Sequence, residues 1–269
     1  MQSPPSPAAV IDLPDGAHRV TLRDGRAAFV KIGRRKPCGF FAAEARGLEA
    51  LREARTLRVP SVYWVDDHGI AIEDLGAGRA RAADWERAGR GLARLHRRTG
   101  EQFGSGLDGW CGDSAQDNTP DPDGFRFFAE RRLLPQGRRA LDGGRLDRGD
   151  LARLESICAR LKDLLPQQPP VLVHGDLWSG NVHACANGEL ALIDGGAVHD
   201  GWAEGDLAML TLFGMPPEEF FGAYAVEAGI DSSWRGRAPL LNLYHLLNHL
   251  NLFGRGYYAA VADVLSRYA

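Results

Sequence analysis

Alternating apolar and polar positions mark the first regular elements of the chain. In “HRVTLRDGRAAFVKI” (residues 18–32) the apolar positions recur at every second residue on both sides of the pair Asp24-Gly25. Such alternation is typical of a half-buried strand, and Asp-Gly is a favoured hairpin turn. The pattern therefore predicts a β-hairpin whose alternating apolar positions are Val20, Leu22, Ala28, Val30 and Ile32.

A helix and two more strands are predicted next. The segment “FFAAEARGLEALREA” (residues 40–54) is rich in Ala, Leu, Glu and Arg, which are strong helix formers. In “SVYWVDDHGIAIEDLG” (residues 61–76) two short apolar runs flank a turn at Asp67, His68 and Gly69. Residues 1–76 are therefore predicted to form a small sheet that carries one helix.

Helical periodicity dominates the rest of the chain. In “DWERAGRGLARLHRR” (residues 84–98) the apolar residues fall on one helical face, and Asp84 is the expected N-cap. Residues 100–124 are rich in Gly, Asp and Pro and are predicted to be mostly loop. Beyond this loop we expect further helices, interrupted only by the strand-like runs “VLVH” (residues 171–174) and “LALI” (residues 190–193). The prediction is an α+β chain with a β-rich N-lobe (residues 1–76) and a mostly helical C-lobe (residues 77–269).

Composition and charge narrow the function classes. The chain has 269 residues, 44% of them hydrophobic, and a formal net charge of −3, which argues against a nucleic-acid or anionic-membrane binder. Its four cysteines are widely spaced and form no CxxC pair, as expected for a reduced cytoplasmic protein. The N-terminal stretch has no pattern of a signal peptide, and no run is long and apolar enough to span a membrane. Oligomeric state has no signature in the sequence.

Asp176 and Asn181 lie between the two strand-like runs, and a second aspartate, Asp194, directly follows the second run. In “HGDLWSGN” (residues 174–181) four residues separate Asp176 from Asn181, and “LALID” places Asp194 at the end of a strand. This is the order of residues in a phosphoryl-transfer site, in which the first Asp is the base and the other two side chains hold Mg²⁺. Hard oxygen ligands suit Mg²⁺. We therefore expect Asp176 to be the catalytic base and Asn181 and Asp194 to be the metal ligands.

Such a site also needs a cation for the nucleotide phosphates. Lys31 lies on a predicted strand, and Glu44 lies on the helix that follows, where it is placed to pair with the lysine. Each of these positions alone is more often a turn, cap or solvated residue. Together, in this order, they favour ATP and Mg²⁺ chemistry. His174 is expected to brace the backbone rather than to react.

Several motifs make the chain similar to a known family, the fructosamine kinase (ketosamine-3-kinase) family, which belongs to the aminoglycoside-phosphotransferase-like branch of the protein-kinase-like fold. The resemblance covers about residues 20–257 and is most specific in “HGDLWSGN”, chiefly through Trp178. Other matching segments are “FGSGLDGWCGDSAQDNTP”, “FFAERRLLPQGRRA”, “EGDLAMLTLFG” and “LYHLLNHLNLFGRGY”.

The resemblance implies a two-lobed kinase that phosphorylates the 3-hydroxyl of a ketosamine, either a small molecule or a sugar attached to a protein. It implies that the main chain around Glu73 and Leu75, in “IEDLG”, forms the hinge that meets adenine, and that Asp206 steadies the catalytic loop. The chain departs from the family before Lys31, where Gly16 is the only obvious glycine of an abbreviated phosphate-binding loop. The phosphates would then be held mainly by Lys31 and the metal.

Acceptor-binding residues are less clear from sequence. Trp178 lies between the base and a metal ligand, where its ring would stack on a sugar or attract an ammonium group, or else pack under the loop. In “LLNLYHLLNHLNLF” (residues 240–253) neutral polar residues, His249 among them, share one stripe of a largely apolar helix and either bond to protein groups or line the cleft. His245 and His249 have the spacing of a metal-chelating pair, but no third ligand is evident.

Three other functions compete. The same chemistry would serve an aminoglycoside or another small alcohol, and the acidic loop “DSAQDNTPDPDG” is the one feature that suits such a cationic acceptor. A non-catalytic binding protein of kinase fold draws support only from the short glycine loop. Metal-dependent hydrolysis is disfavoured because the carboxylates lack the His partners typical of such sites.

Overall fold

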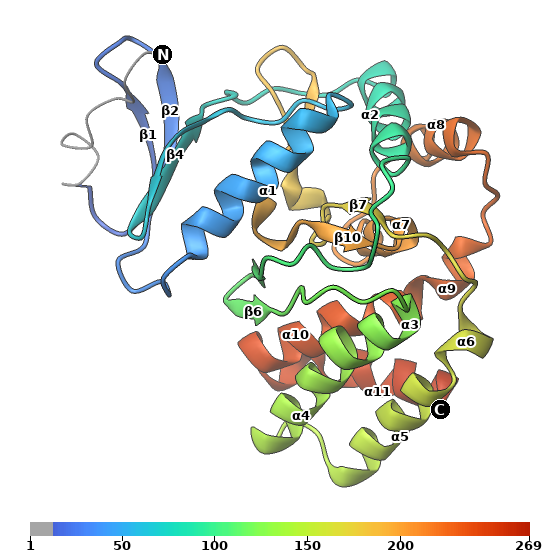
Figure 1. Cartoon of the computed structure of the whole chain (residues 1–269). Coiled ribbons are helices and arrows are strands. Elements are labelled where there is room, and N and C mark those ends of the chain that lie inside the picture. The colour runs from blue at the N-terminus through green and yellow to red at the C-terminus, as the bar shows by residue number, and fades with distance from the viewer. Residues whose placement is uncertain (1–12) are drawn as a thin grey trace.

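A four-stranded antiparallel sheet forms the N-terminal part of the computed structural model, which describes residues 13–269 (Figure 1). Its spatial order is β1-β2-β4-β3. The strands are β1 (Gly16–Thr21), β2 (Ala27–Ile32), β3 (Val62–Asp66) and β4 (Gly69–Glu73). Both expected hairpins are present, and the register pairs Val30 with Ala71 and Lys31 with Ile70. The prediction about a signal peptide falls largely on residues 1–12, which lie outside the described residues.

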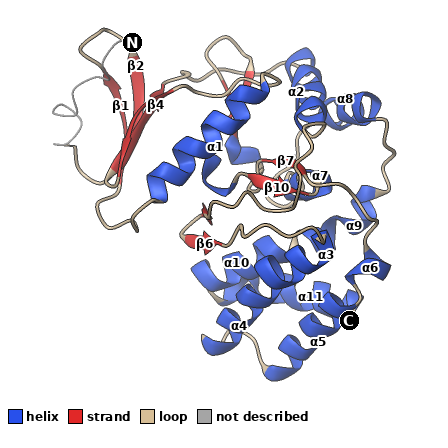
Figure 2. Ribbon diagram, viewed as in Figure 1, coloured by secondary structure: helices blue, strands red, loops and turns tan. Residues whose placement is uncertain are grey.

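Helix α1 (Phe40–Ala54) crosses from this sheet to the rest of the molecule, as Figures 1 and 2 show. Its buried residues, including Glu44, Gly47 and Leu48, face inward. Gly47 is needed for close packing, because a Cβ atom there would lie 1.9 Å from the carbonyl oxygen of Gly195. The helix therefore sits directly on the turn that follows Asp194.

The C-terminal part is mostly helical, as predicted (Figure 2). Its α-helices are α2 (Ala82–Leu95), α3 (Gly124–Phe127), α4 (Leu134–Asp142), α5 (Arg148–Ala159), α6 (Leu161–Leu164), α7 (Ala203–Met209), α8 (Glu218–Ala228), α9 (Trp234–Leu241), α10 (Leu243–Phe253) and α11 (Tyr258–Tyr268). A π-helical segment, η2 (Phe128–Leu133), joins α3 to α4, and 3₁₀ turns occupy η3 (Ser179–Asn181), η4 (Gly195–Ala197) and η5 (Arg255–Tyr257).

Three two-stranded ribbons support the loops of this part. They are β5 (Gly109–Cys111) with β6 (Ser114–Gln116), β7 (Val171–Val173) with β10 (His199–Gly201), and β8 (Val182–Ala184) with β9 (Leu190–Leu192). The β8–β9 hairpin also bonds to the N-terminal part, since Ala186 donates its N–H to the Leu75 carbonyl at 3.0 Å. The short strands β5 and β6 lie in the stretch that we expected to be mostly loop.

Two local predictions need correction. Asp84 is not the N-cap of α2: it is the third residue of the helix, and its carboxylate accepts the N–H of Arg81 at 2.8 Å. A carboxylate at this position completes a capping arrangement from inside the first turn. The apolar stretch from residue 240 to 253 is also not one helix, because it breaks at Asn242, whose side-chain amide donates to the Ala208 carbonyl at 2.8 Å.

One hydrophobic core runs through both parts of the chain. Its largest cluster joins Leu48 of α1 and Ile70 of β4 to Leu92 of α2 and Leu250 of α10. A smaller cluster, centred on Val30, covers the other face of the sheet. No helix of the described residues is long and apolar enough to cross a membrane. The division at residue 76 into two domains stays a prediction.

Candidate active site

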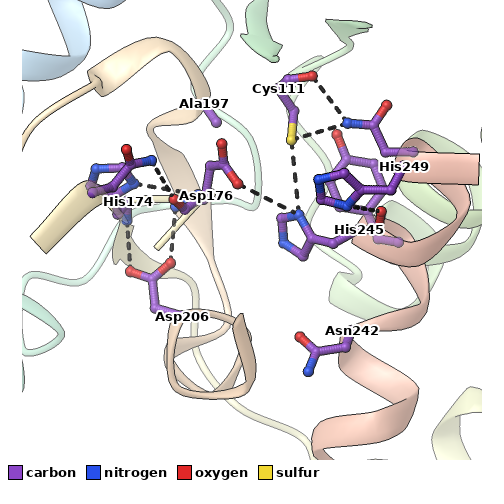
Figure 3. A network of polar contacts seen from close by, with 12 residues as sticks. Cys111, His174, Asp176, Ala197, Asp206, Asn242, His245 and His249 are labelled. Carbon is purple, nitrogen blue, oxygen red and sulfur yellow. Dashed lines mark hydrogen bonds and ion pairs between the residues drawn. The ribbon is translucent and has the colours of Figure 1, made fainter. Parts of the chain in front are cut away.

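The loop after β7 carries the first predicted site residues. Gly175 has φ of 78°, and a Cβ atom there would lie 2.2 Å from the carbonyl oxygen of Ala197, so glycine is required. The Asp206 carboxylate accepts the N–H groups of His174 at 2.8 Å and of Gly175 at 2.9 Å (Figure 3). His174 donates from Nε2 to the Ile193 carbonyl at 2.8 Å. These contacts hold the loop from two sides.

Asp176 follows in the same loop, with 22% of its side chain exposed. Burial raises the pKa of Asp176 to about 6, and the neighbouring negative charges of Asp194 and Asp206 act in the same direction. A carboxylate with such a pKa is a better proton acceptor near neutral pH than an ordinary aspartate. The loop therefore presents a group suited to general-base chemistry.

Lys31 and Glu44 meet as the sequence suggests. Lys31 Nζ lies 2.6 Å from Oε1 of the buried Glu44 and 3.4 Å from Oδ2 of Asp194. Burial alone would lower the pKa of Lys31, but the carboxylates of Glu44 and Asp194 raise it above its ordinary value. The lysine is therefore a fixed cation beside Asp194.

Asn181 and Asp194 are linked through the backbone. The Asn181 side-chain amide donates to the Asp176 carbonyl at 2.8 Å, and the Ile193 N–H donates to the Asn181 carbonyl at 3.1 Å. Asp194 has φ of 66°, which is uncommon for a residue other than glycine and costs about 1–3 kcal/mol. Its side chain is half exposed. The strained backbone turns this carboxylate toward Lys31, with oxygen donors suited to Mg²⁺.

Most of these groups line one cavity of about 350 Å³, but the buried Asn181 is not among its lining residues. Lys31, Glu44, Asp176 and Asp194 contribute to its wall, and Phe40 and Trp110 add aromatic surface. Glu73 and Leu75 are not among its lining residues. The Glu73 carboxylate pairs with Arg58, and the Leu75 carbonyl accepts from Ala186. The hinge role of these two residues stays a prediction.

Trp178 and His249 lie in an aromatic cluster instead of the cavity wall. Trp178 is 39% exposed and packs edge-on against Phe213, with ring centroids 6.4 Å apart. Phe213 contacts His249, whose ring stacks on Tyr257 at 5.1 Å. Burial lowers the pKa of His249, and Nδ1 of this ring is 2.9 Å from the His245 carbonyl. Nδ1 of His249 is therefore engaged within its own helix.

Sequence reasoning missed Cys111, which lies beside the loop that carries Asp176. Its Sγ is 3.8 Å from Nδ1 of His245, and that nitrogen is 3.9 Å from Oδ1 of Asp176 (Figure 3). Burial lowers the pKa of His245 to about 3. No local signal marks Cys111, because its partner follows 134 residues later in the chain.

Comparison with known proteins places this arrangement in a family. The family model for fructosamine kinase matches residues 15–269. The chain belongs to the fructosamine kinase family. It is 38% identical over 249 residues to the protein named “probable ketoamine kinase” of Synechocystis sp., covering 89% of this chain and 82% of that protein. It is 34% identical over 259 residues to the chloroplastic protein-ribulosamine 3-kinase of Arabidopsis thaliana, covering 91% of this chain and 77% of that protein.

Solved structures agree with this membership. A candidate fructosamine-3-kinase from Thermobifida fusca superposes with a TM-score of 0.86 at 39% identity, covering 93% of this chain and 88% of that chain. The aminoglycoside phosphotransferase APH(2″)-IIa, in a ternary complex with streptomycin and ATP, has a TM-score of 0.63 at 15% identity, with 95% and 90% coverage. At this low identity, the similarity to the aminoglycoside phosphotransferase shows a shared fold and nothing more. The chain thus has the predicted α+β, protein-kinase-like architecture.

Proposed function

We propose that this fructosamine kinase transfers the γ-phosphoryl group of ATP to the 3-hydroxyl of a ketosamine. The observation that carries the proposal is the convergence of Lys31, Glu44, Asp176 and Asp194 on one cavity in a chain of this family. Asp176 accepts the proton of the acceptor hydroxyl, and its raised pKa suits that role. The residues act mainly by positioning and by charge neutralisation.

Asn181 and Asp194 are the proposed ligands of Mg²⁺. Asn181 uses its amide nitrogen to bond to the Asp176 carbonyl, which leaves the amide oxygen as the atom to coordinate a cation. Two oxygen donors with room for water fit the requirements of Mg²⁺. When bound, Mg-ATP supplies the phosphoryl group and the positive charge that screens it. Lys31, held by Glu44, contacts the phosphates, and the backbone near Glu73 and Leu75 receives the adenine.

Trp178 and His249 are the proposed contacts of the acceptor. Their aromatic cluster offers ring faces next to the loop that carries Asp176. A ring beside the secondary ammonium of a ketosamine contributes about 0.5–2 kcal/mol. The acceptors we propose are ribulosamines and fructosamines, free or on a protein lysine. Four free thiols suit a cytoplasmic location.

An aminoglycoside acceptor loses its main support in the structure. The acidic loop that would attract a polycationic acceptor has its carboxylates paired with basic side chains of the same protein. The pairs are Asp113 with Lys36, Asp117 with Arg131, Asp121 with Arg126, and Asp123 with Lys162. Paired carboxylates leave little uncompensated negative charge for a cationic ligand.

A coupled ADP-release assay with Mg-ATP tests the proposal. The acceptors are the ribulosamine and fructosamine derivatives of a small amine, a peptide with a glycated lysine, and a panel of aminoglycosides. We expect turnover with the ketosamines, and nuclear magnetic resonance of the product should place the phosphate on the 3-oxygen. Turnover confined to aminoglycosides, or ATP binding without any turnover, would overturn the proposed function.

A further inference from the structure

Three metal-binding side chains meet at the edge of the proposed active site. Cys111 ends β5, Asp176 lies in the loop after β7, and His245 lies on α10. One ligand atom from each lies within 4.8 Å of the other two. Figure 3 shows the sulfur of Cys111 and the carboxylate of Asp176 both directed at the His245 ring. Elements far apart in sequence thus place a thiol, a carboxylate and an imidazole around one point.

The separations are close to those of a tetrahedral zinc site. With Zn–S near 2.3 Å and Zn–N or Zn–O near 2.0–2.2 Å, neighbouring ligand atoms lie roughly 3.3–3.7 Å apart. The observed Sγ–Nδ1 distance is 3.8 Å, and the Oδ1–Nδ1 distance is 3.9 Å. For these two pairs an inward movement of a few tenths of an ångström would therefore suffice, and all three ligand atoms already lie within 4.8 Å of one another.

Surrounding contacts hold two of these residues in place. Cys111 and His245 are 3% and 6% exposed. The side-chain amide of Asn248, on the same helix as His245, donates to the Cys111 carbonyl at 3.0 Å and to Sγ at 3.4 Å. A hydrogen bond to the ligand sulfur is a usual outer contact of a metal site.

We propose that Cys111, Asp176 and His245 form a Zn²⁺ site that withdraws Asp176 from catalysis. The thiol of Cys111 loses its proton to solvent when the Zn–S bond forms, His245 binds through Nδ1, and Asp176 binds through a carboxylate oxygen. Three protein ligands leave the fourth position of the metal open. The inhibitory consequence rests on the proposed function of Asp176, but binding of the metal does not.

The ligand chemistry separates this site from the proposed Mg²⁺ site. Sulfur and imidazole donors select borderline-soft metals such as Zn²⁺, whereas Asn181 and Asp194 offer only oxygen. The 350 Å³ cavity borders the proposed site, because its wall includes Asp176 and both neighbours of Cys111, Trp110 and Gly112. One cleft would thus hold an activating and an inhibiting cation at different places.

Cobalt titration of the nucleotide-free protein tests binding directly. Co²⁺ replaces Zn²⁺, and its bond to a thiolate gives a charge-transfer absorption band. We expect one equivalent of Co²⁺ to produce this band in the native protein and in Cys38→Ser, which removes the exposed thiol as a control. The band should be lost in Cys111→Ser. No band in the native protein, or a band that persists in Cys111→Ser, would overturn the site.

Inhibition is tested separately, at buffered free Zn²⁺ with Mg-ATP and a ketosamine. Without zinc, Cys111→Ser should turn over the ketosamine. Its half-inhibition should need at least about tenfold more Zn²⁺ than that of the native protein, because loss of even an outer contact of a metal site typically lowers metal affinity by that factor. Equal inhibition of both proteins would show that Zn²⁺ acts elsewhere and would overturn the inhibitory role. If Cys111→Ser fails to fold, by thermal unfolding, His245→Gln takes its place in both tests. If the native protein gives the cobalt band but shows no turnover with a ketosamine, the proposed function fails while the metal site stands.

Discussion

Single charged side chains do most of the positioning in this site. Asp206 is 1% exposed, and both of its carboxylate oxygens accept hydrogen bonds from the loop that carries Asp176. The same carboxylate also contacts His96. Glu44 is buried and orients Lys31. Neither residue is itself a proposed base or phosphate contact, but Asp206 fixes the loop of the proposed base and Glu44 fixes the proposed phosphate contact. At the scale of the residue, the site is built by buried carboxylates that hold a loop and a lysine.

Replacing Asp176 with Asn should remove the proposed base while preserving its size. We expect turnover with a ketosamine to fall by about 10²- to 10⁴-fold, the usual contribution of a general base. ATP affinity should stay within about threefold, because Asn181, Asp194 and Lys31 are unchanged. Steady-state ADP release and calorimetric titration with nucleotide measure the two quantities. Asp163→Asn, an exposed change on α6, serves as the control. Full turnover in Asp176→Asn would show that another group is the base.

Asp206→Asn should destabilise the protein in a pH-dependent way. Burial acts to raise the pKa of Asp206. The hydrogen bond from His96, the charges of His96 and His174, and the backbone hydrogen bond from His174 outweigh burial and hold the pKa of Asp206 below its ordinary value. An aspartate whose pKa is lower in the folded than in the unfolded protein stabilises the fold fully at pH values above its unfolded pKa of about 4. This stabilisation is lost as the pH falls through the pKa of the folded state. We expect the variant to lose about 2 kcal/mol or more at pH 7, because charge-assisted bonds to a buried loop are lost.

Urea unfolding of both proteins, at pH 7 and at steps below pH 4, measures this difference. The gap in unfolding free energy should narrow toward acid. A gap that stays constant with pH would mean that the charge of Asp206 does not contribute and that only the loss of a hydrogen-bond acceptor matters. The same measurement on Asp163→Asn gives the background for a carboxylate exposed to solvent.

At the scale of elements, the sequence predicts the strands and helices that follow from local patterns. It misses the contacts that depend on how distant segments pack. Period-two alternation around Asp24-Gly25 predicts the β1–β2 hairpin, and Ala-rich composition predicts α1. The β5–β6 hairpin was not predicted because its strands have three residues each and lie among loop-forming residues. The meeting of Cys111 with His245 depends on how that hairpin packs on α10. The approach of Lys31 to Asp194 depends likewise on how the sheet packs on the rest of the chain, and only the order of residues in a phosphoryl-transfer site made it predictable.

Packing of α1 on η4 gives a prediction at this scale. In Gly47→Ala the added Cβ would lie 1.9 Å from the Gly195 carbonyl oxygen, so one backbone must move. We expect a loss of about 1–3 kcal/mol of stability, as for overpacked cores, together with weaker nucleotide binding because η4 directly follows Asp194. Gly222→Ala on α8 is the matched control, since its Cβ meets nothing within 4 Å.

The control should gain about 0.5–1 kcal/mol, because alanine replaces glycine inside a helix without strain. Urea unfolding gives both stabilities, and calorimetric titration gives the nucleotide affinity. A Gly47→Ala protein as stable as the native one would mean that α1 and η4 can move apart freely. The close contact would then have no part in placing Asp194.

At the scale of the whole molecule, two visibly different parts share one interior. The core cluster that contains Leu48 and Ile70 also contains Leu92 and Leu250, and the β8–β9 hairpin bonds back to Leu75. In the wall of the cavity Phe40 meets Trp110, with ring centroids 5.4 Å apart. The two parts are therefore joined at several separate contacts around the proposed nucleotide site.

This shared core predicts that the sheet and the helices unfold together. Differential scanning calorimetry should show one transition with equal calorimetric and van't Hoff enthalpies, although the chain is two-lobed. Mg-ATP should shift the whole transition upward, because a ligand bound only to the folded state stabilises everything that unfolds with it. Hydrogen exchange should give the amides of β2 and α10 the same opening free energy. Two separate transitions, or a sheet that opens well before α10, would show that the lobes are independent domains. The core that joins them would then contribute little to cooperativity.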